Sequence, residues 1–331
     1  MNNNTQNNVI DYSGLSPDAV LDAVESVGFL SDGTSFALNS YENRVYQIGI
    51  EESVPLIAKF YRPLRWSDEQ ILEEHSFSAE LTAAELPVVS PISIDGSSLF
   101  NYQGYRFALY PRQGGREPNL DNPDNLLQLG RFMGRMHAIA ASKSFAYRPD
   151  INIQNYGYDC VNFISENFIP KALAVSYNSL TTDLLAAVNT QLEKYQQVKK
   201  IRSHGDCHVG NILWRDDSPH FVDFDDCRTA PAVQDLWLLL NGERHEQELQ
   251  LAELIAGYDE FHSFAPVELN LIESLRTLRL IHYCAWLARR WQDPAFPKAF
   301  PWFNSDRYWG EHILELREQM AAMNEPPLRL L

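Results

Sequence analysis

The sequence predicts an α+β fold in two lobes: an N-terminal antiparallel β-sheet with a helix, then a mainly helical C-terminal lobe that carries a β-hairpin. Three observations lead to this prediction. Short apolar runs separated by polar turns fill much of the first third of the chain. The segment Pro111–Pro118 is rich in Gly, Pro and Arg, as linkers are. Beyond it, apolar residues recur mainly at helical spacing. We therefore expect a disordered tail at residues 1–10, an N-terminal lobe at 11–112 and a C-terminal lobe at 113–331.

Length and composition limit the classes of function. The chain has 331 residues, of which 45% are hydrophobic, so it can bury substantial cores. Its net charge of −17 argues against nucleic acid or an anionic membrane as the main partner. The four cysteines follow no metal or disulfide spacing, which favours a reducing compartment. The sequence has no signal-peptide pattern and no long uncharged apolar run, so we expect a soluble cytoplasmic protein. It also has no long apolar heptad repeat, so we expect a monomer.

The N-terminal lobe is expected to begin with a helix over Pro17–Val27, where apolar residues follow a Ser-Pro start. Five strands should follow: Ser35–Asn39, Arg44–Ile50, Leu56–Tyr61, Pro87–Ile94 and Tyr105–Tyr110. The last two would flank the turn at Asp95–Gly96. A helix over Ser67–Leu86 should lie between the third and fourth strands, because Ser67 is a good N-cap followed by acidic residues.

The C-terminal lobe is predicted from helical periodicity. Helices are expected at Asn125–Ala140, Leu180–Gln196, Val233–Leu240, Gln247–Phe264 and Glu268–Trp291. The segment Asp293–Trp302 has too many prolines for a helix and too many aromatic residues for a flexible loop. We expect it to pack as a rigid wrap.

The chemistry is concentrated in Ser203–Ala230. Its expected hairpin has strands at Asn211–Trp214 and His220–Phe224 and a turn at Arg215–Pro219. Pairing of these strands would bring Asp206, Asn211 and Asp223 together. Two carboxylates and an amide oxygen are hard ligands that suit magnesium.

A lysine inside the third strand completes the set of charged candidates. Lys59 lies in an apolar run, where a buried ammonium normally requires a partner. Glu73 and Glu74 of the following helix are the candidates. Glu74 is favoured because it shares a helical face with Phe77 and Leu81, whereas Glu73 should point more toward solvent.

These residues match the needs of phosphoryl transfer, in which a protein mainly positions the reactants and neutralises charge. Asp206 would accept the proton of the attacking hydroxyl, and Asn211 and Asp223 would hold magnesium on the phosphates of ATP. Lys59, oriented by Glu74, would contact the α- and β-phosphates.

The remaining nucleotide contacts are expected from two segments. The loop Ser40–Asn43 would cover the phosphates with its backbone N–H groups and the Ser40 hydroxyl. Backbone groups near Tyr110 and Arg112 would bind the base.

The string HGDCHVGN, closely followed by VDFDD, resembles the catalytic loop and metal-binding segment of the aminoglycoside phosphotransferase and choline kinase branch of the protein-kinase-like superfamily. The strings NSYENRVYQ, KFYRP, ILEEH and PAVQDLW resemble bacterial stress-signalling kinases of that branch. The resemblance implies a bilobal protein-kinase-like fold and an ATP- and magnesium-dependent serine/threonine protein kinase with a role in envelope stress. It also assigns Asp206, Asn211, Asp223 and Ser40 the roles given above, and makes Asp235 the buried aspartate that steadies the catalytic loop. His204 would shape that loop by packing and hydrogen bonding.

Several alternatives remain open at this stage. The same catalytic loop would serve a small-molecule kinase with an aminoglycoside, choline or homoserine-like acceptor, and a nucleotide-sensing pseudokinase is a third possibility. Asp225 and Asp226 either assist metal binding or form a solvated acidic turn or a helix cap. Zinc at His204 and His208 is disfavoured, because the nearby oxygen ligands suit a harder ion. Gly205 stands where typical eukaryotic protein kinases have arginine, so we expect no activation by phosphorylation of a loop.

Overall fold

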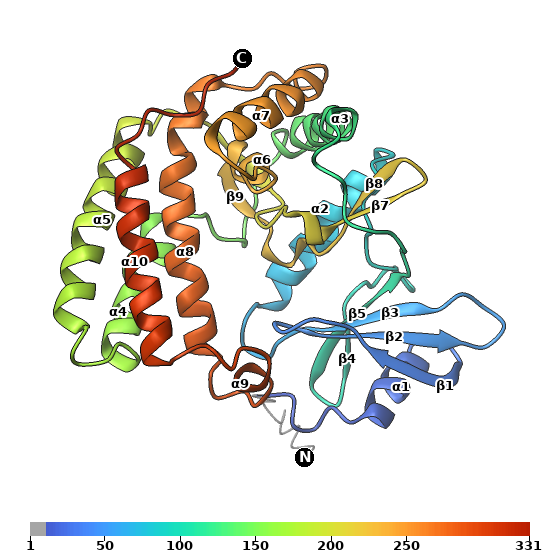
Figure 1. Ribbon diagram of the computed structural model, residues 1–331. Helices are drawn as coiled ribbons and strands as arrows, with labels where there is room; N and C mark the ends of the chain where they lie inside the picture. Colours follow the sequence, from blue (N-terminus) through green and yellow to red (C-terminus); the bar gives the residue numbers. More distant parts are fainter. Residues whose placement is uncertain (1–10) are drawn as a thin grey trace. The chain divides into compact units, whose positions relative to one another are not determined.

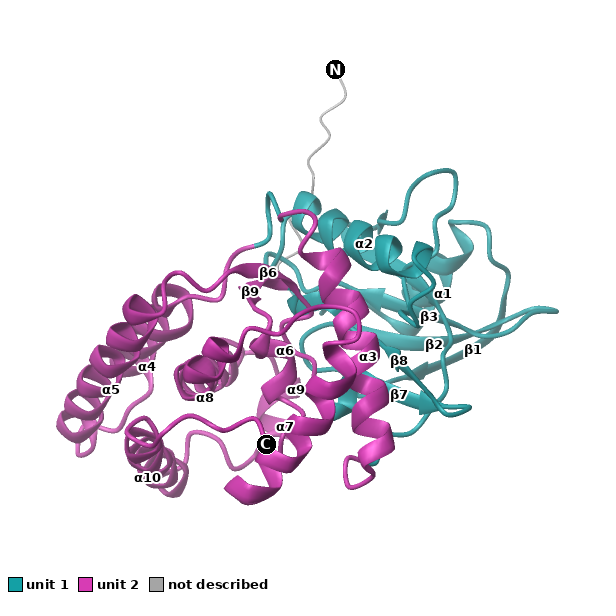
Figure 2. Cartoon of the chain, turned by 90° about the horizontal axis from the view of Figure 1, so that it is seen from above, with its two compact units in different colours: residues 1–119, 145–148, 208–227 teal, residues 120–144, 149–207, 228–331 magenta. Residues whose placement is uncertain are grey.

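The computed structural model describes residues 11–331, and the chain divides into two units. Unit 1 contains the chain up to Asn119 together with residues 145–148 and 208–227, and unit 2 contains the rest (Figure 2). The β-hairpin at residues 212–221 belongs to unit 1, although it forms a two-stranded sheet of its own. Isolated bridges from Val88 to Phe221 and from Arg116 to Trp214 tie the hairpin to the rest of unit 1. The expected tail at residues 1–10 lies outside the described residues.

Unit 1 is built on a five-stranded sheet (Figure 1). Its strands are β1 (Ser31–Ala37), β2 (Arg44–Ile50), β3 (Leu56–Phe60), β4 (Phe100–Tyr102) and β5 (Tyr105–Pro111). The order is β1-β2-β3-β5-β4, and every pairing is antiparallel. Lys59 therefore sits in the central strand, paired with Val45 on one side and Ala108 on the other.

Two helices accompany this sheet. Helix α1 (Pro17–Glu25) packs Val20 and Val24 into a core with strand residues such as Phe107. Helix α2 (Asp68–Ala83) begins at the expected cap, since Ser67 and Gln70 exchange side-chain to backbone hydrogen bonds of 3.3 and 2.9 Å. Its buried face includes Phe77.

The expected strand over Pro87–Ile94 is wrong. Its prolines have no N–H to donate to a ladder, and the segment forms only two isolated bridges, from Val88 to Phe221 of the hairpin and from Ile94 to Ser97. Strand β4 is the true fourth strand, joined to β5 by a two-residue turn at Gln103–Gly104 with φ of 51° and 89°. Two positive φ angles are typical of the turns that match strand twist. The turn at Asp95–Gly96 forms, but it closes only one bridge, from Ile94 to Ser97.

The hairpin consists of β7 (Ile212–Arg215) and β8 (Ser218–Phe221). Its turn, Asp216–Asp217, is shorter than expected, and both residues have positive φ. The second strand ends before Asp223, whose φ of 60° and ψ of 66° are left-handed and break the extended chain. A further pair of strands, β6 (Lys200–Ser203) and β9 (Arg228–Pro231), forms a small sheet in unit 2 that the sequence did not suggest.

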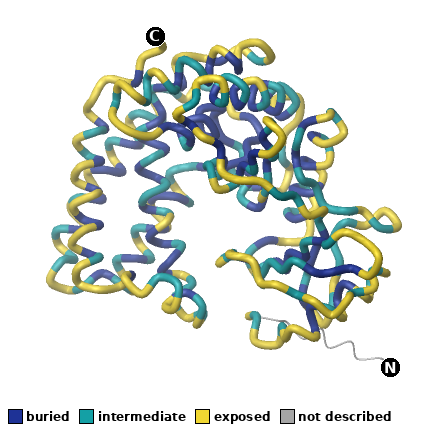
Figure 3. The backbone as a smooth tube through the Cα atoms, turned by 45° about the vertical axis from the view of Figure 1, so that its right-hand side comes forward, coloured by how far each residue is buried: buried dark blue, intermediate teal, exposed yellow. Residues whose placement is uncertain are grey.

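Unit 2 is mainly helical, and buried and exposed residues alternate along its helices (Figure 3). The helices are α3 (Pro123–Ala140), α4 (Asp159–Asn167), α5 (Ala174–Lys194), α6 (Val233–Trp237), α7 (Arg244–Tyr258), α8 (Ile272–Arg289), α9 (Ala295–Ala299) and α10 (Asp306–Ala322). Helices α4 and α10 were not predicted. Helix α9 contradicts the expectation that Asp293–Trp302 has no helix, because Pro297 lies in a first turn where its missing N–H costs nothing. Within residues 11–331, no helix is both long enough and apolar enough to cross a membrane.

Helices α3 and α7 approach each other through glycines. A Cβ atom at Gly130 would overlap the carbonyl oxygen of Leu254, and one at Gly257 would overlap that of Leu127. A Cβ atom at Gly134 would likewise overlap the carbonyl oxygen of Tyr258. Any side chain at these positions would force the two helices apart.

We therefore expect Gly130→Ala to lower the free energy of unfolding by about 1–3 kcal/mol through overpacking, despite the better helix propensity of alanine. Gly310→Ala in α10 is the matched control, because a Cβ there meets nothing within 4 Å. That control should be neutral or stabilising by up to about 1 kcal/mol. Thermal denaturation of both variants provides the measurement, and equal midpoints would contradict the packing argument.

Candidate functional site

The ammonium of Lys59 is the centre of a buried cluster of charges in unit 1. Its Nζ atom lies 2.9 Å from Asp223 Oδ1, 3.4 Å from Asp225 Oδ1 and 3.5 Å from Glu74 Oε1. Burial alone would lower the pKa of Lys59, but Asp223, Asp225 and Glu74 together hold it well above its ordinary value. The lysine is therefore a cation that can be shared among several anions.

Helix α2 places Glu74, rather than Glu73, at the lysine. Glu74 is buried, and its second oxygen accepts a hydrogen bond from Arg148 Nη2 at 2.9 Å. Burial raises the pKa of Glu74, and the cations of Lys59 and Arg148 oppose that shift. Glu73 does not simply face solvent: its carboxylate accepts backbone hydrogen bonds of 2.5 to 2.9 Å from the three residues of 146–148.

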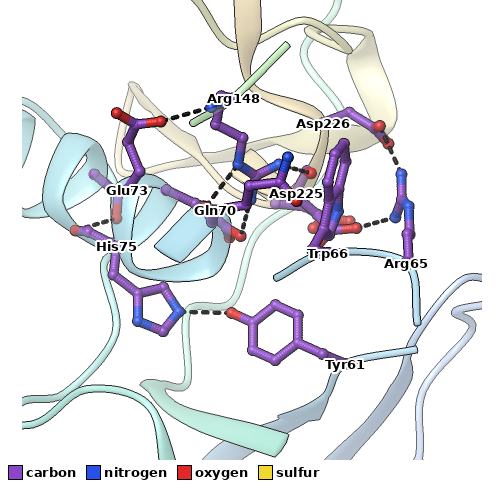
Figure 4. A network of polar contacts seen from close by, with 12 residues as sticks. Tyr61, Arg65, Trp66, Gln70, Glu73, His75, Arg148, Asp225 and Asp226 are labelled. Carbon is purple, nitrogen blue, oxygen red and sulfur yellow. Dashed lines mark hydrogen bonds and ion pairs between the residues drawn. The ribbon is translucent and has the colours of Figure 1, made fainter. Parts of the chain in front are cut away.

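Arg148 is a residue that the sequence analysis missed. It is buried, and its guanidinium donates to the carbonyl oxygens of Gln70 at 2.8 Å and Asp225 at 2.6 Å. It also lies over the ring of Trp66, 4.4 Å from the centroid. Arg148 thus connects helix α2, through Gln70 and Glu74, to the acidic segment that follows β8. Figure 4 shows Arg148 between Gln70 and Asp225.

Arg65 binds the side chains of the acidic segment after β8, whereas Arg148 binds a backbone carbonyl there. The Arg65 guanidinium binds the carboxylates of Asp225 and Asp226, the latter at 2.6 Å (Figure 4). Burial raises the pKa of Asp225, but Arg65 and then Lys59 bring it below its ordinary value. Both carboxylates thus have a cation partner, which favours a structural role over direct metal binding. No local pattern identifies Arg65, whose partners lie 160 and 161 residues away.

Asn211 and Asp223 both lie at the open end of the hairpin. The pair Ile212–Phe221 is in register, and the N–H of Val222 donates to the carbonyl of Asn211 at 3.0 Å. The Asp223 side chain is half exposed, so a carboxylate oxygen is accessible to an ion. Within residues 11–331, no group of three or more His, Cys, Asp or Glu side chains could hold a metal by itself. Amide and carboxylate oxygens of this kind fit magnesium, whose other ligands are commonly phosphate and water oxygens.

Asp235 anchors the loop before Asp206, within unit 2. It is fully buried, and its carboxylate accepts the backbone N–H groups of His204 at 2.8 Å and Gly205 at 2.9 Å. The Nε2 atom of His137 lies 3.1 Å away. Burial raises the pKa of Asp235, but the contacts with His137 and with the loop lower it overall. A buried carboxylate in this setting fixes the backbone of the loop.

Asp206 itself makes an ion pair that the sequence did not suggest. Arg279 of α8 places Nη1 2.5 Å from Asp206 Oδ1. The neighbouring Cys207 is completely buried, and burial raises the pKa of its thiol well above the usual range. This favours a filler role for Cys207 over a reactive one.

The expected nucleotide residues lie at separate places in unit 1. Ser40 is partly buried in the loop between β1 and β2. The hydroxyl of Tyr110 lies 3.0 Å from that of Tyr61, inside the unit. Arg112 is exposed and donates from Nε to Gln47 Oε1 at 2.7 Å. The structure thus brings Lys59, Glu74 and Asp223 together, but the side chains of Tyr110 and Arg112 are engaged elsewhere.

Comparison with known proteins gives a consistent result. Residues 35–270 match the model of the phosphotransferase enzyme family. The chain is 45% identical over 325 residues to stress response kinase A of Escherichia coli K12, with 98% of each chain covered. It is 44% identical over 324 residues to serine/threonine protein kinase RdoA of Salmonella typhimurium LT2, again with 98% of each covered.

Solved structures agree on the fold. An amicoumacin kinase superposes with a TM-score of 0.73 at 18% identity, covering 99% of this chain and 97% of that one. A microcompartment-associated aminopropanol kinase gives 0.68 at 17% identity, covering 94% and 99%. With an N-terminal antiparallel sheet, a mainly helical remainder and full-length kinase relatives, the chain belongs to the phosphotransferase enzyme family and has its protein-kinase-like fold.

Proposed function

We propose that this protein is an ATP-dependent kinase that transfers the γ-phosphoryl group to a serine or threonine hydroxyl of another protein. The observation that carries the proposal is the Lys59 cluster, in which one strand lysine is held by a helix glutamate and by the aspartate that follows the hairpin. Relatives that align over 98% of their length are named as stress response and serine/threonine protein kinases, which supports a protein acceptor and a role in stress.

On this proposal, unit 1 binds the nucleotide. The ammonium of Lys59 exchanges its contact with Asp223 for contacts with the α- and β-phosphates. Glu74 keeps the lysine side chain oriented. The Ser40 loop covers the phosphates, and backbone groups near Tyr110 and Arg112 bind the base. Asn211 and Asp223 would hold magnesium, which when bound neutralises charge on the phosphates. The amicoumacin kinase was solved with AMP-PNP and Ca²⁺, which supports a nucleotide and a divalent ion.

Asp206 is the proposed base. Its carboxylate accepts the proton of the acceptor hydroxyl while the hydroxyl oxygen attacks the γ-phosphorus. Asp235 and His204 support it by fixing the loop backbone. We further propose that the protein acts as a monomer in the cytoplasm.

Asp206→Asn should reduce phosphoryl transfer by at least about a hundredfold, because the amide cannot take the proton. Binding of ATP with magnesium should stay within about twofold of wild type, since Asp206 does not hold the nucleotide. Turnover is measured with labelled ATP, and affinity by calorimetry. If Asp206→Asn kept the turnover of the wild-type protein, Asp206 would not be the base.

Asp223→Ala should weaken magnesium-dependent ATP binding about tenfold or more, equivalent to about 1.4 kcal/mol. Asp216→Asn, at the exposed tip of the same hairpin, is the matched control and should bind normally. Calorimetry with and without EDTA provides the measurement. The assignment of Asp223 as a ligand fails if the variant keeps the magnesium dependence of the wild-type protein.

The acceptor class is tested by labelling protein acceptors and a panel of amino-alcohol, aminoglycoside and homoserine-like metabolites in parallel. We expect transfer to protein serine or threonine, abolished by Asp206→Asn. Rapid transfer to one metabolite with negligible protein labelling would instead establish a small-molecule kinase. Stabilisation by ATP and magnesium without any turnover would indicate a nucleotide-sensing pseudokinase.

A further inference from the structure

The ion pair between Arg279 and Asp206 lies entirely within unit 2 and joins helix α8 to the loop after β6. The Nη1 atom of Arg279 is 2.5 Å from Oδ1 of Asp206. The two side chains are 38% and 26% exposed, so each is partly shielded by the protein and partly accessible to solvent.

We propose that Arg279 is a positioning residue for Asp206 in phosphoryl transfer. This inference rests on the proposed function, because it requires Asp206 to be the base. Asp235 fixes the backbone of the loop through the N–H groups of His204 and Gly205. That anchor does not set the rotation of the Asp206 side chain, which Arg279 controls by binding one carboxylate oxygen.

The geometry suits a base that must also orient its substrate. A carboxylate has two oxygens and about four acceptor sites, so one charge-assisted bond to arginine leaves capacity for a hydroxyl. In the transfer step the acceptor oxygen bonds to the γ-phosphorus, and the bond from that phosphorus to the β–γ bridging oxygen breaks. The hydroxyl proton moves to Asp206, and ADP leaves with the electron pair of the broken bond. A side chain held in one rotation keeps this arrangement aligned.

Arg279 also acts on charge. The transferring phosphoryl group is negative, and a bare carboxylate beside it would repel it. A guanidinium in contact with Asp206 offsets that repulsion while leaving the carboxylate able to accept a proton. Both effects concern the rate of transfer and do not require Arg279 to bind ATP.

A purely structural reading predicts something different. A partly exposed ion pair contributes only about 0–1 kcal/mol to stability, so its loss should change the melting temperature little and should leave the rate per folded molecule unchanged. The size of the kinetic effect, measured with the melting temperature, therefore separates the two readings.

Arg276 provides a matched control on the same helix. It lies one turn before Arg279, its Nε is 3.2 Å from Glu273 Oε2, and its guanidinium lies 4.8 Å from the ring centroid of Trp237. Arg276→Ala removes a similar side chain and charge at a site that engages other partners.

The experiment measures kcat, KM for ATP and melting temperature for wild type, Arg279→Ala, Arg279→Lys, Arg276→Ala and Asp206→Asn. We expect Arg279→Ala to lose about 10- to 100-fold in kcat with KM for ATP within about twofold, a pattern typical of an interaction made in the transition state. Arg279→Lys should retain part of the activity, because it keeps the charge but not the planar fork. Added guanidinium should partly restore Arg279→Ala, and Arg276→Ala should behave as wild type.

Two outcomes overturn the inference while leaving the proposed function intact. One is full activity of Arg279→Ala when Asp206→Asn is inactive, and the other is an equal loss in Arg276→Ala. Absence of transfer by the wild-type protein to any acceptor would overturn the proposed function itself and this inference with it.

Discussion

Unit 1 is organised around the ammonium group of Lys59. This group lies on the central strand of the sheet and is almost completely buried. An unpaired ammonium there would cost several kcal/mol, so the surrounding chain must supply negative charge at short range. Helix α2 brings Glu74, and the segment after β8 brings Asp223 and Asp225. These carboxylates come from parts of the chain far apart in sequence, and their shared need for Lys59 is what draws those parts together.

The same carboxylates need more positive charge than one lysine provides. Arg148 and Arg65 supply it, and each also binds a second element. Replacing such a network with apolar residues can leave stability unchanged or improve it, so stability alone is a weak explanation for these buried ions. We infer that the network is retained because it holds Glu74 and Asp223 at defined positions around the lysine. Removing one member would leave an opposite charge buried without compensation.

In unit 2, one residue holds the backbone of the loop before Asp206, and a different residue holds the Asp206 side chain. Asp235 accepts two N–H groups from the loop and needs no contact with Asp206 to do so. Arg279 reaches the Asp206 carboxylate from another helix. One residue thus fixes the backbone of the loop, and another holds the side chain of Asp206.

The sequence by itself determined the features that depend on near neighbours in the chain. Helical phase selected Glu74 over Glu73, the Ser67 cap predicted the start of α2, and the spacing of Asn211 and Asp223 predicted a hairpin with oxygen ligands at its open end. Only the tertiary structure decided the partners of Arg65, Arg148 and Arg279, which lie 160, 77 and 73 residues away along the chain. An arginine with a distant partner has the same local pattern as one on the surface, because propensity and periodicity extend over a few residues only. Strand β4 was missed for a related reason: whether a short extended segment joins a sheet depends on the strand beside it, which the chain places there only on folding.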